Sequence, residues 1–219
     1  MDIRTTFRWS RIFFVVCAFG NPLHTAIGAE QDDALYRALV QRVEAGDLTI
    51  DFRSLRIACV RSSLCEPRAT KAGLAAMNRA VSDREYDKVV EIGERLIRSG
   101  FVNIEAHATS ASANVELHDS VRAKFHLDVT TALIRSILSS GDGKTKESAF
   151  EVICDREEYV TLTALGQPYL GPEVSFSTVE SGAHHYDRWD IWHPQTDQMV
   201  VFFFNTDAFS PTKSRAGKE

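Results

Sequence analysis

The sequence predicts an α+β protein with a helical front and a small stranded back. Apolar side chains recur every three or four positions through most of residues 30–140, which is typical of amphipathic helices. From residue 141 to 209 short alternating or continuous apolar runs lie between Gly and Pro, which is typical of strands. Helices followed by strands favour one α+β domain, in which an antiparallel helical array packs with a small antiparallel β region.

The first 29 residues have the layout of a secretory signal peptide. Three arginines precede a short apolar run at residues 12–20 (IFFVVCAFG), and small side chains follow at residues 26–29. The run is much shorter than the ~20 apolar residues that a membrane span needs. We expect cleavage after Gly28 or Ala29 and a periplasmic or secreted product with no stable membrane span. An uncleaved membrane anchor is the alternative.

The composition is that of a globular protein and argues against nucleic acid as a partner. The chain has 219 residues, 44% of them hydrophobic, and a formal net charge of −5. Removal of the arginine-bearing first 29 residues makes the exported chain more acidic still, whereas nucleic-acid sites usually present a basic stripe. The polar tail at residues 210–219 is predicted to be disordered.

Six helices are expected in the front of the chain, each from its apolar spacing and its end signals. They cover residues 32–47, a segment opened by the N-cap Asp51, and residues 69–81, 83–99, 103–117 and 120–139. Val89 and Ala123 lie 34 positions apart in similar surroundings, and 34 residues is the tetratricopeptide period. Small residues at Ala106 and Ala111 let a neighbouring helix approach closely. We therefore predict tetratricopeptide-like hairpins, with a generic alanine-seamed bundle as the alternative.

The back of the chain is expected to hold a hairpin. The expected elements are a strand at 150–154, a helix at 155–165, and strands at 187–192 and 199–204 on either side of a turn at 193–197.

Motifs spread along the chain carry a resemblance to a known family. They are GDLTIDFRSLR at residues 46–56, NIEAH at 103–107, SGDGKT at 140–145, and Ala149-Phe150, Val152-Ile153 and Glu157-Glu158-Tyr159. Over about residues 34–206 the chain resembles a family of exported bacterial proteins known as domain of unknown function 4919. The resemblance implies secretion and a helical front, and it implies no particular activity.

Three cysteines remain after export, namely Cys59, Cys65 and Cys154, and an odd number leaves one thiol over. Cys59 and Cys65 are six positions apart, close enough to bridge across a helix end, and exported proteins keep disulfides. Two small buried thiols are the alternative. In the resembled family aromatic residues stand at both positions, and a paired change to cysteine fits a disulfide.

The stretch from Gly141 to Thr145 (GDGKT) looks like half of a phosphate-binding loop. Such a loop needs a glycine five positions before its Gly-Lys, and it lies between a strand and a helix. Leu138 stands at that first position here, a helix precedes the stretch and a strand follows it. We interpret Gly141 as a helix C-terminus and Asp142-Gly143 as a turn.

Two groups of polar side chains are candidate binding residues in the front and middle of the chain. Arg56, with Asp142 and Lys144, either joins the front to the back through caps and an ion pair or lines a polar groove. His107 lies on the alanine-rich seam, either in a pocket with a perturbed acid or base or as a satisfied histidine.

A group of histidines and aspartates marks the predicted hairpin. On a strand, His185, Asp187 and His193 point to one face, and such nitrogen and oxygen ligands suit zinc. The spacing matches no HExxH or CxxC pattern, and in the resembled family an acidic residue usually precedes Pro194 in place of His193. We therefore predict a polar hairpin that holds neither a metal nor another cofactor, with a zinc site as the alternative.

These observations predict an exported, non-enzymatic module that binds a peptide or an envelope protein on its helical array. The alternative is a hydrolytic or metal-assisted enzyme at the helix–sheet junction, with His184, His185 and Asp187; a structural accessory is a third interpretation. The candidate binding residues are Arg56, His107, Asp142, Lys144, His184 and Asp187.

Overall fold

The computed structural model describes the backbone of residues 22–67, 71–167 and 171–210, and side chains from residue 28 onward. The predicted apolar run at residues 12–20 and the tail from residue 211 lie outside this part of the chain. The helices are α1 (Pro22–Glu44), α2 (Phe52–Arg61), α3 (Lys71–Ser82), α4 (Tyr86–Ser99), α5 (Ile104–Glu116), α6 (Ser120–Leu138) and α7 (Asp155–Ala164). The strands are β1 (Phe150–Glu151), β2 (Val174–Ser181), β3 (His184–His193) and β4 (Gln198–Asn205).

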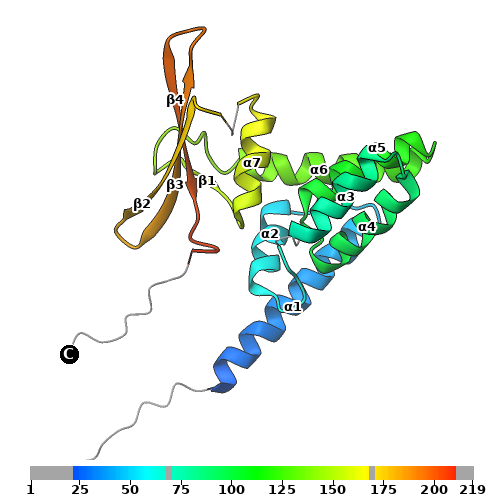
Figure 1. The fold of residues 1–219 in the computed structure, drawn as a ribbon. Helices are drawn as coiled ribbons and strands as arrows, with labels where there is room; N and C mark the ends of the chain where they lie inside the picture. Colours follow the sequence, from blue (N-terminus) through cyan, green and yellow to red (C-terminus); the bar gives the residue numbers. More distant parts are fainter. Residues whose placement is uncertain (1–21, 68–70, 168–170, 211–219) are drawn as a thin grey trace, which may run out of the picture.

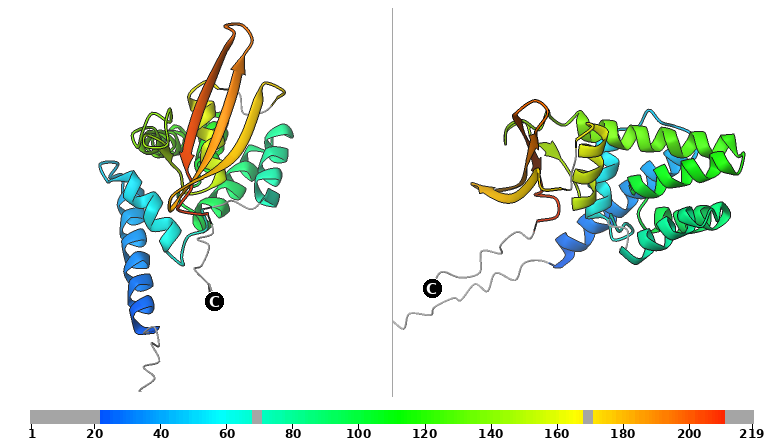
Figure 2. Two further views of the ribbon diagram at one scale, coloured as in Figure 1. Left: turned by 90° about the vertical axis from the view of Figure 1, so that its left-hand side faces the viewer. Right: turned by 45° about the horizontal axis from the view of Figure 1, so that its top comes forward.

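The predicted α+β class is confirmed. Helices α1 to α6 lie on one side, the sheet lies on the other, and α7 stands between them (Figures 1 and 2). Short polar residues begin three of the helices, because the side chains of Asp51, Asn103 and Asp119 each accept a hydrogen bond from a first-turn N–H. Short loops then force consecutive helices of α3 to α6 to run antiparallel.

The sheet has the order β1-β4-β3-β2 and is mixed. β3 and β4 pair antiparallel, as predicted for the hairpin, and β2, which was not predicted, pairs antiparallel with β3. β1 pairs parallel to β4 through Phe150–Phe204 and Glu151–Asn205. The strand predicted at 150–154 is shortened to two residues because the chain turns at Cys154 into α7.

One apolar core joins the helices to the sheet. Leu55 of α2, Val129 of α6, Leu162 of α7, Ile191 of β3 and Phe204 of β4 are all fully buried in it. A second, smaller core lies among α3, α4 and α5, around residues such as Met77 and Val89. The first core is what fixes α7 between the helical front and the sheet.

α1 begins at Pro22 and runs through the expected cleavage position at Gly28 or Ala29. Cleavage there would remove the first turns of this helix. Within the described residues, no helix combines the length and the apolar character needed to cross a membrane.

A disulfide joins Cys59, near the end of α2, to Cys65 in the following segment, with the two Cα atoms 5.1 Å apart. Cys154 is a free, buried cysteine.

Candidate functional site

A groove of about 640 Å³ lies where α7 meets the pair of helices α5 and α6. It is lined by Ile104, Glu105, Ala108, Thr130, Ile134, Arg156, Tyr159, Val160, Thr163 and Ala164. A second hollow of about 590 Å³ lies farther along the same two helices and is lined by Ala111, Ser112, Val115, His118, Ser120, Ala123, Lys124 and Leu127.

The two hollows follow one face of the α5–α6 pair. On α5 the lining positions 104, 108, 111 and 115 recur at helical spacing, and on α6 the positions 134, 130, 127 and 123 do the same. We call this surface the α5–α6 groove. It extends along α5, which at 13 residues is ~20 Å long.

The α5–α6 groove is lined mainly by small and apolar side chains. Ala108, Ala111 and Ala123 line its floor, and Val115 and Leu127 stand at its rim with 61% and 58% of their surfaces exposed. Apolar surface left in water is unfavourable by about 25 cal/mol per Å², so a partner that covers these side chains gains free energy.

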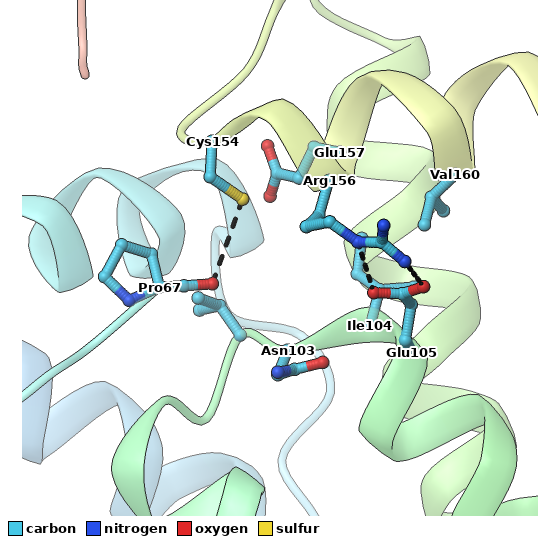
Figure 3. Close-up of a pocket in the computed structure, with 9 residues that line it drawn as sticks. Pro67, Asn103, Ile104, Glu105, Cys154, Arg156, Glu157 and Val160 are labelled. Carbon is cyan, nitrogen blue, oxygen red and sulfur yellow. Dashed lines mark hydrogen bonds and ion pairs between the residues drawn. The ribbon is translucent and has the colours of Figure 1, made fainter. Parts of the chain in front are cut away.

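An ion pair closes the α7 end of the α5–α6 groove. Arg156 Nε lies 2.8 Å from Glu105 Oε2, and its Nη2 bonds the other carboxylate oxygen (Figure 3). The Arg156 guanidinium also lies over the Tyr159 ring. The hydrogen bonds from Glu105 raise the pKa of Arg156 above its ordinary value. Because the pair joins α5 to α7, it holds the end wall of the groove in place.

A small pocket of about 10 Å³ lies behind this ion pair and shares Ile104, Glu105, Arg156 and Val160 with the groove. The Cys154 thiol points into the same region and donates to the Pro67 carbonyl oxygen 3.8 Å away (Figure 3). Burial raises the pKa of this thiol to about 12. Cys154 is therefore an uncharged packing residue near neutral pH, because nucleophilic attack by cysteine needs the thiolate.

Arg56 lies in the core and not in a groove. It is 0% exposed, and its Nε and Nη2 bond both carboxylate oxygens of Glu157 at 2.8 and 2.7 Å. Its Nη2 also donates to the Glu151 carbonyl oxygen, 2.5 Å away. Of the two sequence interpretations, the ion pair that joins front to back describes Arg56.

His107 is also buried, in a short chain of hydrogen bonds. Its Nε2 lies 2.9 Å from the Phe101 carbonyl oxygen and its Nδ1 lies 3.0 Å from Nδ1 of His126. A carbonyl only accepts, so His107 carries its proton on Nε2 and accepts at Nδ1 from His126. Burial, followed by the neighbouring His126, lowers the pKa of His107 to about 3. His107 is thus a neutral, satisfied core histidine.

Asp142 and Lys144 belong to an exposed turn. The Asp142 carboxylate accepts from the Lys144 backbone N–H at 3.0 Å and from the Ser148 hydroxyl at 2.6 Å. The Ser148 bond, more than any other contact, lowers the pKa of Asp142. An N–H that a phosphate cradle would use is therefore already bonded. Gly143 has φ +70°, and a side chain there would collide with the Phe150 ring, so the glycine serves the turn.

The histidines of β3 lie at its two ends, with His184 and His185 beside one carboxylate and His193 far from both. His184 Nδ1 lies 2.6 Å from Asp207 Oδ2, and His185 donates its backbone N–H to the same carboxylate. His193 bonds Gln167 at the other end of the strand, ~26 Å from His185 at 3.3 Å per residue. Sharing a strand face does not bring these side chains together. In the described part of the chain, no three His, Cys, Asp or Glu side chains are placed to hold a metal ion.

Asp187 is paired with a buried acid that the sequence did not single out. Glu158 of α7 is 1% exposed, and its Oε2 accepts from the Trp189 indole N–H at 2.7 Å. Its Oε1 has no donor among the described residues, and the Asp187 carboxyl group lies within hydrogen-bonding reach of Glu158. Two carboxylates cannot bond each other, so one proton must be shared between them. Burial above all raises the pKa of Glu158 to about 9, which places that proton on Glu158.

Sequence reasoning missed the groove's end wall and the acid pair. Arg156 and Glu158 lie among the charged residues that begin α7. Acidic side chains are common in the first turn of a helix because they interact with the helix dipole, so their presence does not by itself indicate a site. The partners of Arg156 and Glu158, Glu105 and Asp187, are distant in sequence. The motif Glu157-Glu158-Tyr159 is part of the family resemblance and so drew attention to this helical turn. It did not indicate which distant residues the turn contacts.

Fold and site together define an α+β protein whose helical front carries an open apolar groove ending at α7. The chain belongs to the family described as Domain of unknown function (DUF4919), whose model matches residues 22–172, more than half of the chain. This match ends before β2, whereas the sequence resemblance was expected to reach residue 206. No curated protein and no solved structure matches the chain.

Proposed function

We propose that this protein is an exported, non-enzymatic binding module, and that its α5–α6 groove holds an amphipathic helix of an envelope protein. The observation that carries the proposal is that two hollows lie in line along one face of α5 and α6. In a tetratricopeptide-like array the next helix would cover this face, and here α7 covers only its end.

The lining favours a helical occupant. Alanines at positions 108, 111 and 123 leave room for a helix backbone to approach, and the rim residues Val115 and Leu127 would flank its apolar stripe. Helix-in-groove recognition uses anchors at i, i+3 or i+4 and i+7, and a ~20 Å groove has room for such a set.

Site-specific photo-cross-linking in cells tests the proposal. A photoreactive phenylalanine replaces Ser112 in the groove, and a matched control replaces Ser82, which is also exposed, also helical and also bonded to the carbonyl four residues back. We expect a discrete adduct with an envelope protein from position 112 and none from position 82. No adduct from position 112, or the same adducts from both positions, would reject the proposal.

One observation favours the alternative, a hydrolytic enzyme at the helix–sheet junction. Glu158 and Asp187 set a protonated carboxyl group beside a carboxylate, which is the pairing that general acid–base chemistry uses. Glu158→Gln and Asp187→Asn would each abolish hydrolysis of generic ester, glycoside or phosphate substrates if this reading holds. Absence of turnover by the wild-type protein across such a panel speaks against it.

A further inference from the structure

The sheet ends at β2, and in the described part of the chain no strand pairs with the outer edge of β2. In Figure 1 and in the right panel of Figure 2, the strand at this edge lies on the side of the sheet away from the helical front. Every side chain of β2 is exposed or partly exposed, and Phe176 keeps 53% of its surface in water although its ring touches Trp189.

Alternate residues of β2 direct their backbone groups outward. The Trp192 N–H donates to the Glu173 carbonyl at 2.8 Å, and this bond continues the β2–β3 register. The odd-numbered residues of β2 are therefore the ones whose backbone groups bond β3. Bonding alternates along an antiparallel strand, so Phe176 and Thr178 point their N–H and C=O groups away from the sheet. No hydrogen bond to another described residue uses these groups.

β2 also lacks the sequence features that prevent an edge strand from pairing with a strand of another molecule. Natural edge strands are protected by lysine, proline or bulges, because unpaired backbone groups are a template for another strand. β2 reads VSFSTVES, with no proline, no lysine and Glu180 as its single charge. Its valines, threonine and phenylalanine favour strand pairing.

We propose that the β2 edge joins two copies of this chain, paired antiparallel about a two-fold axis through Ser177. An axis perpendicular to the sheet leaves the helical layers of both copies on the same face and pairs residues that share a face. Phe176 of each copy then lies opposite Thr178 of the other, and the outward groups of both residues are satisfied.

Neighbouring registers are less favourable. An axis through Phe176 places Thr178 opposite Val174, whose N–H already donates to the Gly171 carbonyl at 3.2 Å. An axis through Thr178 places the Glu180 carboxylate opposite the exposed Phe176 ring. With the axis at Ser177, Glu180 lies opposite Val174, and no two like charges face each other.

Disulfide trapping tests this register in the full chain. In the proposed pairing the two Ser177 residues face each other without bonding, at a Cα separation of ~4.5 Å, which is within disulfide range. The two Ser175 residues lie about 14 Å apart, beyond that range. We expect Ser177→Cys to form a covalent dimer under mild oxidation and Ser175→Cys to remain uncross-linked. Equal cross-linking of both variants, or of neither, would overturn the proposal.

Sedimentation of the uncross-linked protein gives an independent readout. Thr178→Pro removes an outward N–H without touching the β2–β3 ladder, whereas Thr178→Val loses the same hydroxyl and keeps the N–H. We expect the wild type and the valine variant to dimerise and the proline variant to dimerise at least ten-fold more weakly, with unchanged circular dichroism. A wild-type monomer at every concentration, or a folded proline variant that dimerises normally, would contradict it.

Discussion

Arg56 and Glu157 form a two-point ion pair in the core, with the arginine 0% and the glutamate 3% exposed. Arg56 comes from α2, and Glu157 lies in the first turn of α7. Glu157 also accepts from the Ile153 N–H at 2.9 Å, and Arg56 donates to the Glu151 carbonyl. This one pair therefore fixes the segment that runs from β1 into α7 against the helical front.

Replacing Arg56 by methionine is expected to destabilise the protein by about 3–5 kcal/mol, because it leaves the Glu157 carboxylate buried without its cation. Urea denaturation followed by circular dichroism measures the loss. The double variant Arg56→Met, Glu157→Leu removes both charges and is expected to be more stable than Arg56→Met alone. A single variant as stable as the wild type would show that the pair contributes no net stability.

Because of the proton held on Glu158, the free energy of unfolding is expected to fall as the pH rises. Burial raises the folded-state pKa of Glu158 to about 9 from its ordinary value of 4.5, so between these values the folded state holds a proton that the unfolded state has lost. Stability therefore falls as pH rises from about 4.5 to 9, by at most about 1.4 kcal/mol per pH unit.

Glu158→Gln is the matched variant, since its amide oxygen can accept from Trp189 and its NH2 group can donate to Asp187. We expect it to equal the wild type near pH 5 and to exceed it near pH 8.5 in the urea midpoint. Glu91→Gln, at an exposed i,i+4 ion pair with Arg95, serves as the control and should keep the wild-type profile. Parallel profiles for all three proteins would disprove the shared proton.

Acidification is expected to lower the free energy of unfolding through His107. Its folded-state pKa is lowered to about 3, whereas the unfolded histidine titrates at 6.5, so the unfolded state binds the extra proton between these values. Stability is therefore lost as pH falls below about 6.5. His107→Phe should flatten this part of the profile, at a cost of about 1–3 kcal/mol because the buried Phe101 carbonyl loses its donor. An unchanged acid slope in the variant would contradict this assignment.

The α4–α5 contact depends on the absence of a side chain at Gly93. A methyl group there would collide with the Ser110 hydroxyl, which is buried and has no hydrogen-bond partner among the described residues. We expect Gly93→Ala to destabilise the protein by about 1–3 kcal/mol through overpacking. Adding Ser110→Ala should recover most of that loss in thermal unfolding, and no recovery would locate the clash elsewhere.

The Cys59–Cys65 bridge closes a short loop, with a sequence separation of 6. A loop of this size is expected to add about 2 kcal/mol to the free energy of unfolding. The comparison is between the wild type and Cys59→Ala, Cys65→Ala, both in oxidising buffer. A reducing agent should lower the wild-type midpoint and leave the variant unaffected; a shift in both proteins would point to another cause.

Local patterns predicted most of the helical front. The apolar spacing of residues 83–99 and 120–139 indicated α4 and α6 to within a few residues, because one face of each helix is buried along its whole length. The parallel pairing of β1 with β4 was not predictable in this way. It joins segments more than fifty residues apart, and its two-residue length leaves no periodic signal.

The candidate site was less accessible to sequence reasoning. The sequence indicated Arg56 and His107 as polar residues within structural segments, and the structure buries both beside hydrogen-bonding partners in the core. The α5–α6 groove is lined by alanines that had been assigned to helix packing. A seam that packs one helix and a seam left open for another have the same composition, and the sequence does not distinguish them.

The affinity of the captured segment tests the central claim, that the α5–α6 groove is a binding site. The segment cross-linked from position 112, synthesised as a labelled peptide, is titrated into wild-type protein, Ser112→Trp, which fills the groove, and Ser82→Trp, which adds the same ring outside it. We expect at least ten-fold weaker binding, by fluorescence anisotropy, for Ser112→Trp alone. Equal affinity for all three proteins would show that the segment binds elsewhere.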